Sequence, residues 1–243
     1  MSGGNIAAVV GFAPAIVWML LISQFEGLFD HRKLVLCFGG GMAFGMPVGM
    51  FYGLLGGYLE TLDLSVLSFV FFLPLFTESG KMAVLNSKRF RLRLDTIFYG
   101  TALGAGLGCM MSVYIAYRTF YAFPYLTGEL KAVFLLFVLS LSLSLIHLAS
   151  GCIIGIYAFN GAPWQGFLRA ITVQAAFFSV ILPYMWGVSL FFLPFALGYS
   201  IFVTYAVIYR IVPEAFPEEI KRKMRRERRK LQQKPNKGEE GSR

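Results

Sequence analysis

The stretch LSVLSFVFFLPLFTESGKMAVL, residues 64–85, decides which kind of fold this chain can have. Only two of its side chains are charged, Glu78 and Lys81, and they stand three residues apart near its end. A helix needs roughly 20 mostly apolar residues to cross the hydrocarbon core of a bilayer. We therefore interpret this run as a membrane span that carries a carboxylate and an ammonium group.

The rest of the chain has the same apolar character. Its 243 residues are 57% hydrophobic and 14% charged, whereas a soluble domain would carry about 25% charged residues. The pattern predicts an all-α bundle of seven spans, at about 5–25, 34–58, 64–86, 96–117, 131–157, 166–186 and 189–212. The stretch PYMWGVSLFFLPF, residues 183–195, fits either a tight turn between the last two spans or one long broken segment. We expect one membrane domain over 1–212 and a basic tail over 213–243.

Basic residues predict the orientation of the bundle. They gather in alternate links and in the tail, at Arg32 and Lys33, at Lys88, Arg89, Arg91 and Arg93, and after Val212. The opposite links hold only Arg118 and Lys131. Positive charge favours the cytoplasmic side, so the N-terminus is expected outside and the C-terminus inside. MSGGN at the start has no basic region typical of a signal peptide, so we expect the first span to be retained. The expected location is a bacterial or archaeal cytoplasmic membrane.

The tail suggests a partner. Its last 26 residues hold 11 Lys or Arg and 5 Glu. A basic cluster beside a membrane attracts anionic lipid by about 1 kcal/mol per basic residue. These 26 residues contain no aromatic side chain that would stack on bases, so nucleic acid is not an expected partner.

Glycines recur at helical spacing in three spans. They stand at Gly41, Gly45, Gly49, Gly53 and Gly57, at Gly100, Gly104 and Gly108, and at Gly151 and Gly155. Small residues four apart let membrane helices approach closely. We expect packing within one chain, with self-association into a homo-oligomer as the alternative.

The polar residues inside the spans are few. Glu78, His147 and Gln174 each fall about eight to ten residues from the inner end of their predicted span, a common depth of roughly 12–15 Å. A charged residue at mid-bilayer costs at least about 2.5–3.5 kcal/mol, so such residues usually face a polar interior. The shared depth predicts a single site that also includes Lys81.

The residue types restrict the chemistry of this site. The chain has no His-Glu-x-x-His motif, and one glutamate with one histidine makes no convincing metal site, so neither metal nor cofactor is expected. No Asp lies in the middle of a span, and Ser150, three residues after His147, has no evident base partner. The three cysteines match no metal spacing. Carboxylate chemistry remains, with Glu78 as general base on a water and His147 stabilising the oxyanion.

The order of these motifs resembles the PrsW-type glutamic intramembrane proteases, relatives of the CAAX-processing membrane proteases. That family has Glu-Glu-x-x-Lys in one span, matched here by Thr77 to Lys81. An Asp, Tyr-Gly and a glycine-rich helix follow, matched by RLDTIFYGTALGAGLG at 93–108. A later His with Gly four and eight residues on is matched by His147, Gly151 and Gly155.

The resemblance covers about residues 70–160 and has gaps. Thr77 replaces the first glutamate of the pair, and the family's second histidine and its Glu-Asn pair have no counterpart. The resemblance implies an intramembrane endopeptidase acting on membrane proteins. Glu78, His147 and Lys81 would be catalytic, and Thr77, Tyr99 and Gln174 would support them. The alternatives are a non-catalytic member that binds a partner helix and, third, a proton-coupled carrier.

Overall fold

The computed structural model describes residues 3–56, 68–185, 189–219 and 221–222. All regular structure in these ranges is helical. The helices are α1 Gly3–Ser23, α2 His31–Gly56, α4 Leu73–Leu85, α5 Thr96–Ala122, α6 Leu130–Phe159, α7 Pro163–Met185, α8 Phe192–Ala206 and α9 Val212–Ala215. Short segments are the π-helices η1 Ser68–Phe72 and η3 Val207–Ile211 and the 3-10 helix η2 Pro124–Gly128.

Six helical segments of the described residues are long and apolar enough to cross a membrane, and the last of them runs from Phe192 to Ala215 through α8, η3 and α9. They confirm the prediction of an all-α, multi-pass membrane bundle. The remaining predicted span, 64–86, is described only from Ser68, as η1 followed by α4. Seven crossings and the orientation therefore stay predictions, and residues 223–243 of the basic tail lie outside the described ranges.

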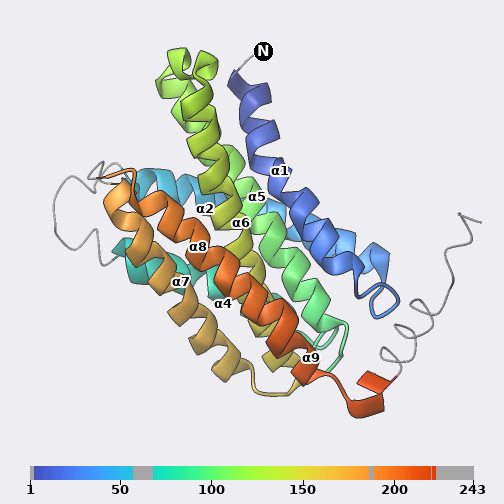
Figure 1. Ribbon diagram of the computed structural model, residues 1–243. Helices are drawn as coiled ribbons and strands as arrows, with labels where there is room; N and C mark the ends of the chain where they lie inside the picture. The colour runs from blue at the N-terminus through green and yellow to red at the C-terminus, as the bar shows by residue number, and fades with distance from the viewer. Residues whose placement is uncertain (1–2, 57–67, 186–188, 220, 223–243) are drawn as a thin grey trace, which may run out of the picture.

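The described residues around positions 183–195 form two helices, α7 and α8, rather than one broken helix. Helices α7 and α8 lie side by side in Figure 1, on either side of a turn at Leu190 and Phe191. The Tyr199 hydroxyl of α8 donates to the carbonyl of Val173 on α7 at 3.1 Å. The two predicted spans are thus separate helices, although residues 186–188 are outside the described ranges.

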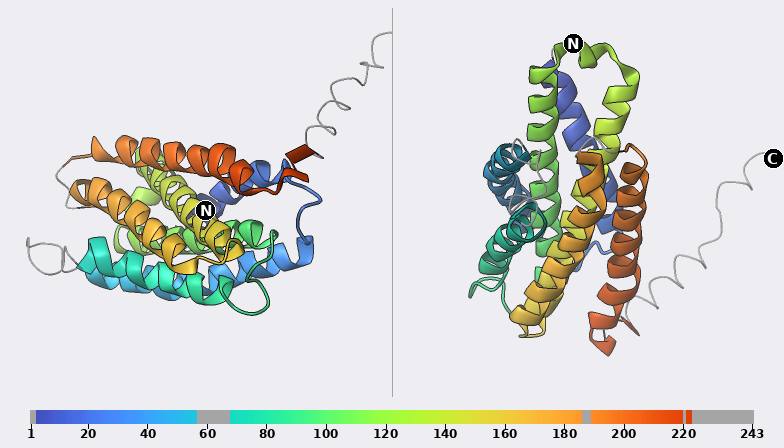
Figure 2. Two further views of the ribbon diagram at one scale, coloured as in Figure 1. Left: turned by 90° about the horizontal axis from the view of Figure 1, so that it is seen from below. Right: turned by 90° about the vertical axis from the view of Figure 1, so that its left-hand side faces the viewer.

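Helices α5 and α6 form the centre of the bundle (Figures 1 and 2). Helix α2 packs on α5, helices α7 and α8 pack on α6, and α1 crosses both central helices. The short α4 lies against α6 and α7 on one side and approaches α2 on the other. This arrangement brings α4 beside the middle of α6.

Glycines allow the two central helices to touch backbone to backbone. A Cβ added at Gly104 would collide with the carbonyl oxygen of His147, and one at Gly108 would lie 2.6 Å from the Cα of Ser144. Gly100 and Gly151 face each other in the same way. The close seam fixes the height of His147 relative to α5.

The glycine stripe of α2 serves the same purpose against α5. A Cβ at Gly45 would lie 2.5 Å from the carbonyl oxygen of Leu107, and Gly41 meets Leu103 similarly. Packing within one chain is therefore confirmed for these glycines. The environment of Gly53 is not described, and Gly57 lies outside the described residues.

A tight turn sets the register of α6 against α7. Gly161 adopts φ of 75°, a conformation that glycine reaches without a Cβ penalty, and Ala162 N donates to the Tyr157 carbonyl at 2.8 Å. Pro163 then begins α7, a position where its missing N–H costs nothing. His147 and Gln174 lie almost equally far from this turn along their helices, so they meet at one level.

The close contact between α5 and α6 at Gly104 leads to a first prediction. Gly104→Ala should destabilise the fold by about 1–3 kcal/mol, because the new methyl group meets a backbone carbonyl that cannot rotate away. Gly198→Ala in α8 is the matched control, since nothing lies within 4 Å of its added Cβ. A dye that reacts with cysteines as they become exposed would follow thermal unfolding, because all three thiols are buried. Equal transition temperatures for the two variants would contradict the close backbone contact between α5 and α6 at Gly104.

Candidate functional site

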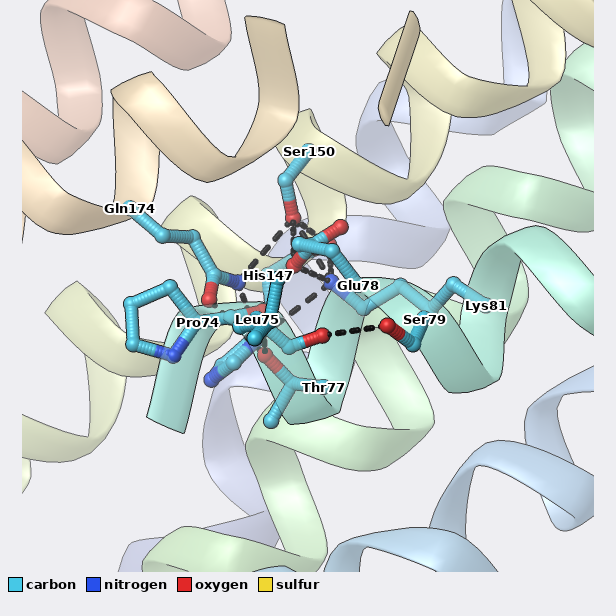
Figure 3. A network of polar contacts seen from close by, with 9 residues as sticks. All are labelled: Pro74, Leu75, Thr77, Glu78, Ser79, Lys81, His147, Ser150 and Gln174. Atoms are coloured by element: carbon cyan, nitrogen blue, oxygen red, sulfur yellow. Dashed lines mark hydrogen bonds and ion pairs between the residues drawn. The ribbon is translucent and has the colours of Figure 1, made fainter. Parts of the chain in front are cut away.

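Six polar side chains from three helices meet in the bundle interior, and we call them the polar cluster (Figure 3). Helix α4 supplies Thr77, Glu78 and Lys81, α6 supplies His147 and Ser150, and α7 supplies Gln174. None of the six has any exposed surface. The structure thus brings Glu78, Lys81, His147 and Gln174 together, and their roles stay predictions.

Lys81 is the hub of the polar cluster. Its Nζ donates to Glu78 Oε1 at 2.6 Å and to Ser150 Oγ at 2.7 Å. The same Nζ lies 3.4 Å from both the carbonyl oxygen and Nδ1 of His147. Glu78 and Lys81 are three apart on α4 and share one face, so their pairing follows from helix geometry. The contacts to α6 tie α4 to the core.

Ser150 connects the ion pair to the rest of the cluster. Its Oγ lies 3.1 Å from Glu78 Oε1 and 3.1 Å from the His147 carbonyl, and it accepts from Gln174 Nε2 at 3.2 Å. A hydroxyl has one hydrogen, and Lys81 also donates to it. Ser150 therefore has its full complement of partners.

Gln174 and Thr77 orient the imidazole of His147. Gln174 Nε2 lies 2.6 Å from His147 Nδ1, while Gln174 Oε1 accepts from Thr77 Oγ1 at 3.0 Å. Nδ1 thus faces two N–H donors, those of Gln174 and Lys81, and acts as the acceptor. The hydrogen-bond network accordingly assigns the ring proton to Nε2.

Two atoms of the polar cluster have no hydrogen-bond partner among the described residues, Glu78 Oε2 and His147 Nε2. Buried polar atoms are paired in the great majority of cases, so each exception calls for an explanation. The two are complementary, because the carboxylate oxygen accepts and the imidazole N–H donates. A water molecule or a peptide group offers the opposite functions to both.

The two side chains share one hydrogen-bond partner, the Nζ of Lys81. Lys81 Nζ lies 2.6 Å from Glu78 Oε1 and 3.4 Å from His147 Nδ1, so those two atoms are at most about 6 Å apart. Joint action on one water requires that the free atoms, Glu78 Oε2 and His147 Nε2, both come within hydrogen-bond reach of that water. In the described part of the chain, no three His, Cys, Asp or Glu side chains converge as metal ligands do.

Tyr99 lies apart from the polar cluster in its hydrogen bonding. Its hydroxyl donates to Asp95 Oδ2 at 3.1 Å and accepts from the backbone N–H of Asp30 at 3.2 Å. Arg93 pairs with the same Asp95 oxygen at 2.9 Å. These contacts join the α1–α2 link to the start of α5. They give Tyr99 a role in holding the end of the bundle, instead of direct contact with Glu78 or His147.

Ser150 is the cluster member that sequence reasoning set aside. It stands on the same face of α6 as His147, but the amine beside it comes from Lys81, 69 residues earlier in the chain. The sequence therefore shows a serine three residues after a histidine, but it does not show the lysine that donates to that serine. The packing of α4 on α6 supplies that partner.

Comparisons with known proteins leave the family of the chain open. No family model matches it, and neither a curated protein nor a solved structure does.

Proposed function

We propose that the polar cluster is the active site of an intramembrane peptide hydrolase of the glutamic type. The observation that carries the proposal is the pair of unpartnered buried atoms, Glu78 Oε2 and His147 Nε2, in an otherwise saturated network. One is a base and the other a hydrogen-bond donor, the two functions that attack of water on an amide requires.

In the proposed reaction, Glu78 Oε2 accepts a proton from a water molecule as the water oxygen bonds to the scissile carbonyl carbon. The carbonyl oxygen becomes an oxyanion, which the Nε2–H of His147 stabilises. The C–N bond then breaks, and Glu78 returns the proton to the leaving amine. Lys81 and Ser150 hold Oε1 throughout, so the free oxygen keeps its direction.

Lys81 is better suited to position Glu78 than to activate Ser150. Its ammonium group is surrounded by acceptors, namely Glu78 Oε1, Ser150 Oγ and two atoms of His147. A lysine that activates a serine must instead receive a proton from it. We therefore assign Ser150 a positioning role.

The substrate class follows from where the polar cluster lies. All six side chains are buried among α4, α6 and α7, which belong to an apolar bundle. A peptide bond that reaches them must come from a segment stable in that environment, such as a helix of another membrane protein. The resemblance to PrsW-type proteases supports the same class, and entry of a substrate requires α4 to move relative to α6 or α7.

A second candidate is a non-catalytic protein of the same fold that binds a partner helix. The observation that favours it is the position of Thr77, where the resembled family has a second carboxylate. Here Thr77 donates to Gln174 and so completes a network that also links α4 to α7. In this case the polar cluster would hold α4 against α6 and α7 and would take no part in a reaction.

The test is cleavage of transmembrane peptides by the reconstituted protein. Ser150→Ala should lower the rate only about fivefold, the effect of losing the hydrogen bond to Glu78 Oε1, roughly 1 kcal/mol, because Lys81 still holds that oxygen. Ser144→Ala is the matched control, since Ser144 is buried on the same helix and contacts Cys109 outside the cluster. Complete loss of activity in Ser150→Ala would make Ser150 the nucleophile. No product with any peptide would favour the non-catalytic candidate.

A further inference from the structure

We propose that a cavity between α2, α4 and α5 binds one acyl chain of an anionic phospholipid, with the lipid phosphate held by Lys33 and Arg89. The cavity has a volume of about 380 Å³, and none of its lining residues belongs to the polar cluster. This volume lies within the range of sites that bind small molecules, roughly 300–1,000 Å³. The proposal does not depend on whether the polar cluster is catalytic.

The walls of the cavity are apolar and open on the outer surface of the bundle. Leu36 of α2 and Val84 of α4 line it, and they are also 68% and 41% exposed. Phe44, Phe90 and Leu103 add further apolar side chains to the walls. In a membrane helix bundle such an outer surface faces lipid, so an acyl chain can enter from the side.

One end of the cavity is cationic. Lys33 stands in the first turn of α2 and Arg89 follows the end of α4, so both belong to the same end of the bundle. Within the described residues Arg89 forms no hydrogen bond or ion pair, and Lys33 has only Asp30 at 3.8 Å. Two weakly satisfied cations beside an apolar cavity complement a phosphate joined to a hydrocarbon chain.

The length of the cavity also suits an acyl chain. Its lining on α2 runs from Lys33 to Phe44, eleven residue steps that span about 16.5 Å at the helical rise. This is about half of the roughly 30 Å hydrocarbon core. A lipid with its phosphate at the cationic end would therefore lie with its chain parallel to α2, as in one leaflet.

The deep end of the cavity reaches α4 beside the polar cluster. Gly80 lines the cavity, and a Cβ added there would lie 2.5 Å from Cε1 of Phe44. Gly80 directly precedes Lys81. A bound chain would thus contact the turn of α4 that carries the Glu78–Lys81 pair, and it would hold that turn against α2.

The headgroup is tested with purified protein in neutral detergent, by counting lipids bound in native mass spectrometry. Phosphatidylglycerol should bind more tightly than phosphatidylcholine with the same chains. Lys33→Ala with Arg89→Ala should weaken its binding about thirtyfold, from the loss of two cations near the phosphate. Lys88→Ala with Arg91→Ala removes equal charge from exposed residues that do not line the cavity, and should leave the affinity unchanged.

The cavity itself is tested by two neighbouring glycines of α2. Gly40 lines the cavity, and its added Cβ would meet only Leu103 Cδ1 at 4.0 Å, so Gly40→Leu should fill the space and abolish tight binding. Gly39 has nothing within 4 Å and does not line the cavity, so Gly39→Leu is the matched control. The basic tail is unchanged in every variant, so lipid bound there cancels from each comparison.

Three results would overturn the proposal. Equal binding by Gly40→Leu and Gly39→Leu would show that the cavity holds no chain. An equal loss of lipid affinity in the double variant of Lys33 and Arg89 and in that of Lys88 and Arg91 would show that the charges act only through a diffuse electrostatic effect. Displacement of the lipid by inorganic phosphate alone would show a site for the free anion, without a role for the apolar walls.

Discussion

Glu78→Gln is expected to lower the rate of peptide cleavage by about 10²–10⁴-fold, the contribution of a positioned general base. Glutamine keeps the shape of the side chain and an oxygen that can accept from Lys81 and Ser150. Its amide cannot take a proton from water, so the free position at Oε2 loses its function. Initial rates in proteoliposomes, measured at equal amounts of folded protein, give the effect.

Two further variants make this result specific. Glu129→Gln, at an exposed residue just before α6, controls for loss of a glutamate and should cleave normally. Glu78→Gln combined with Lys81→Met removes the unpaired ammonium that the single variant leaves behind, and should be equally inactive. A Glu78→Gln protein with more than about a tenth of the normal rate is incompatible with Glu78 as the general base.

Lys81→Met should destabilise the bundle by about 3–5 kcal/mol, the usual effect of removing one partner of a buried ion pair. Lys81 and Glu78 have no exposed surface, and Lys81 also donates to Ser150. Methionine fills a similar volume but leaves the Glu78 carboxylate without its counter-ion. Unfolding can be followed by the exposure of the buried thiols.

The exposed pair of Lys221 and Glu218 provides the comparison. It has the same three-residue spacing, but the two side chains are 27% and 68% exposed. Lys221→Met should therefore change the unfolding free energy by only about 0–1 kcal/mol. The double variant Glu78→Gln with Lys81→Met should regain much of the stability lost in Lys81→Met. If Lys81→Met were as mild as Lys221→Met, Glu78 would have to be stabilised by other groups.

Local patterns were sufficient for much of this fold and for part of the site. Apolar runs of bilayer length predicted the membrane helices, and glycines four apart predicted the close seams at Gly45 and Gly104. The common depth of His147 and Gln174 follows from their equal distance to the turn at Gly161. These features depend on the spacing of residues along one helix or one hairpin, which a sequence displays directly.

Other features required contacts between distant segments. The resemblance to PrsW-type proteases placed Tyr99 with the site, but its hydroxyl bonds to Asp30 and Asp95 at the end of the bundle. The sequence left Ser150 without a partner, because that partner is on α4. It also gave no sign of the cavity near Gly40, since its walls come from three helices.

The sequence by itself determined that this chain is an apolar helical bundle with a few costly polar groups inside its spans. The pairing of Glu78 with Lys81 was also determined there, because three residues bring two side chains to one face of a helix. Only the tertiary structure decided which atoms of these groups are satisfied. Hydrogen bonds from Lys81, Ser150 and Gln174 arrive from three helices, and their geometry leaves Glu78 Oε2 and His147 Nε2 free. Which atoms are paired depends on the distances between side chains of different helices. The spacing of residues along the chain does not give these distances.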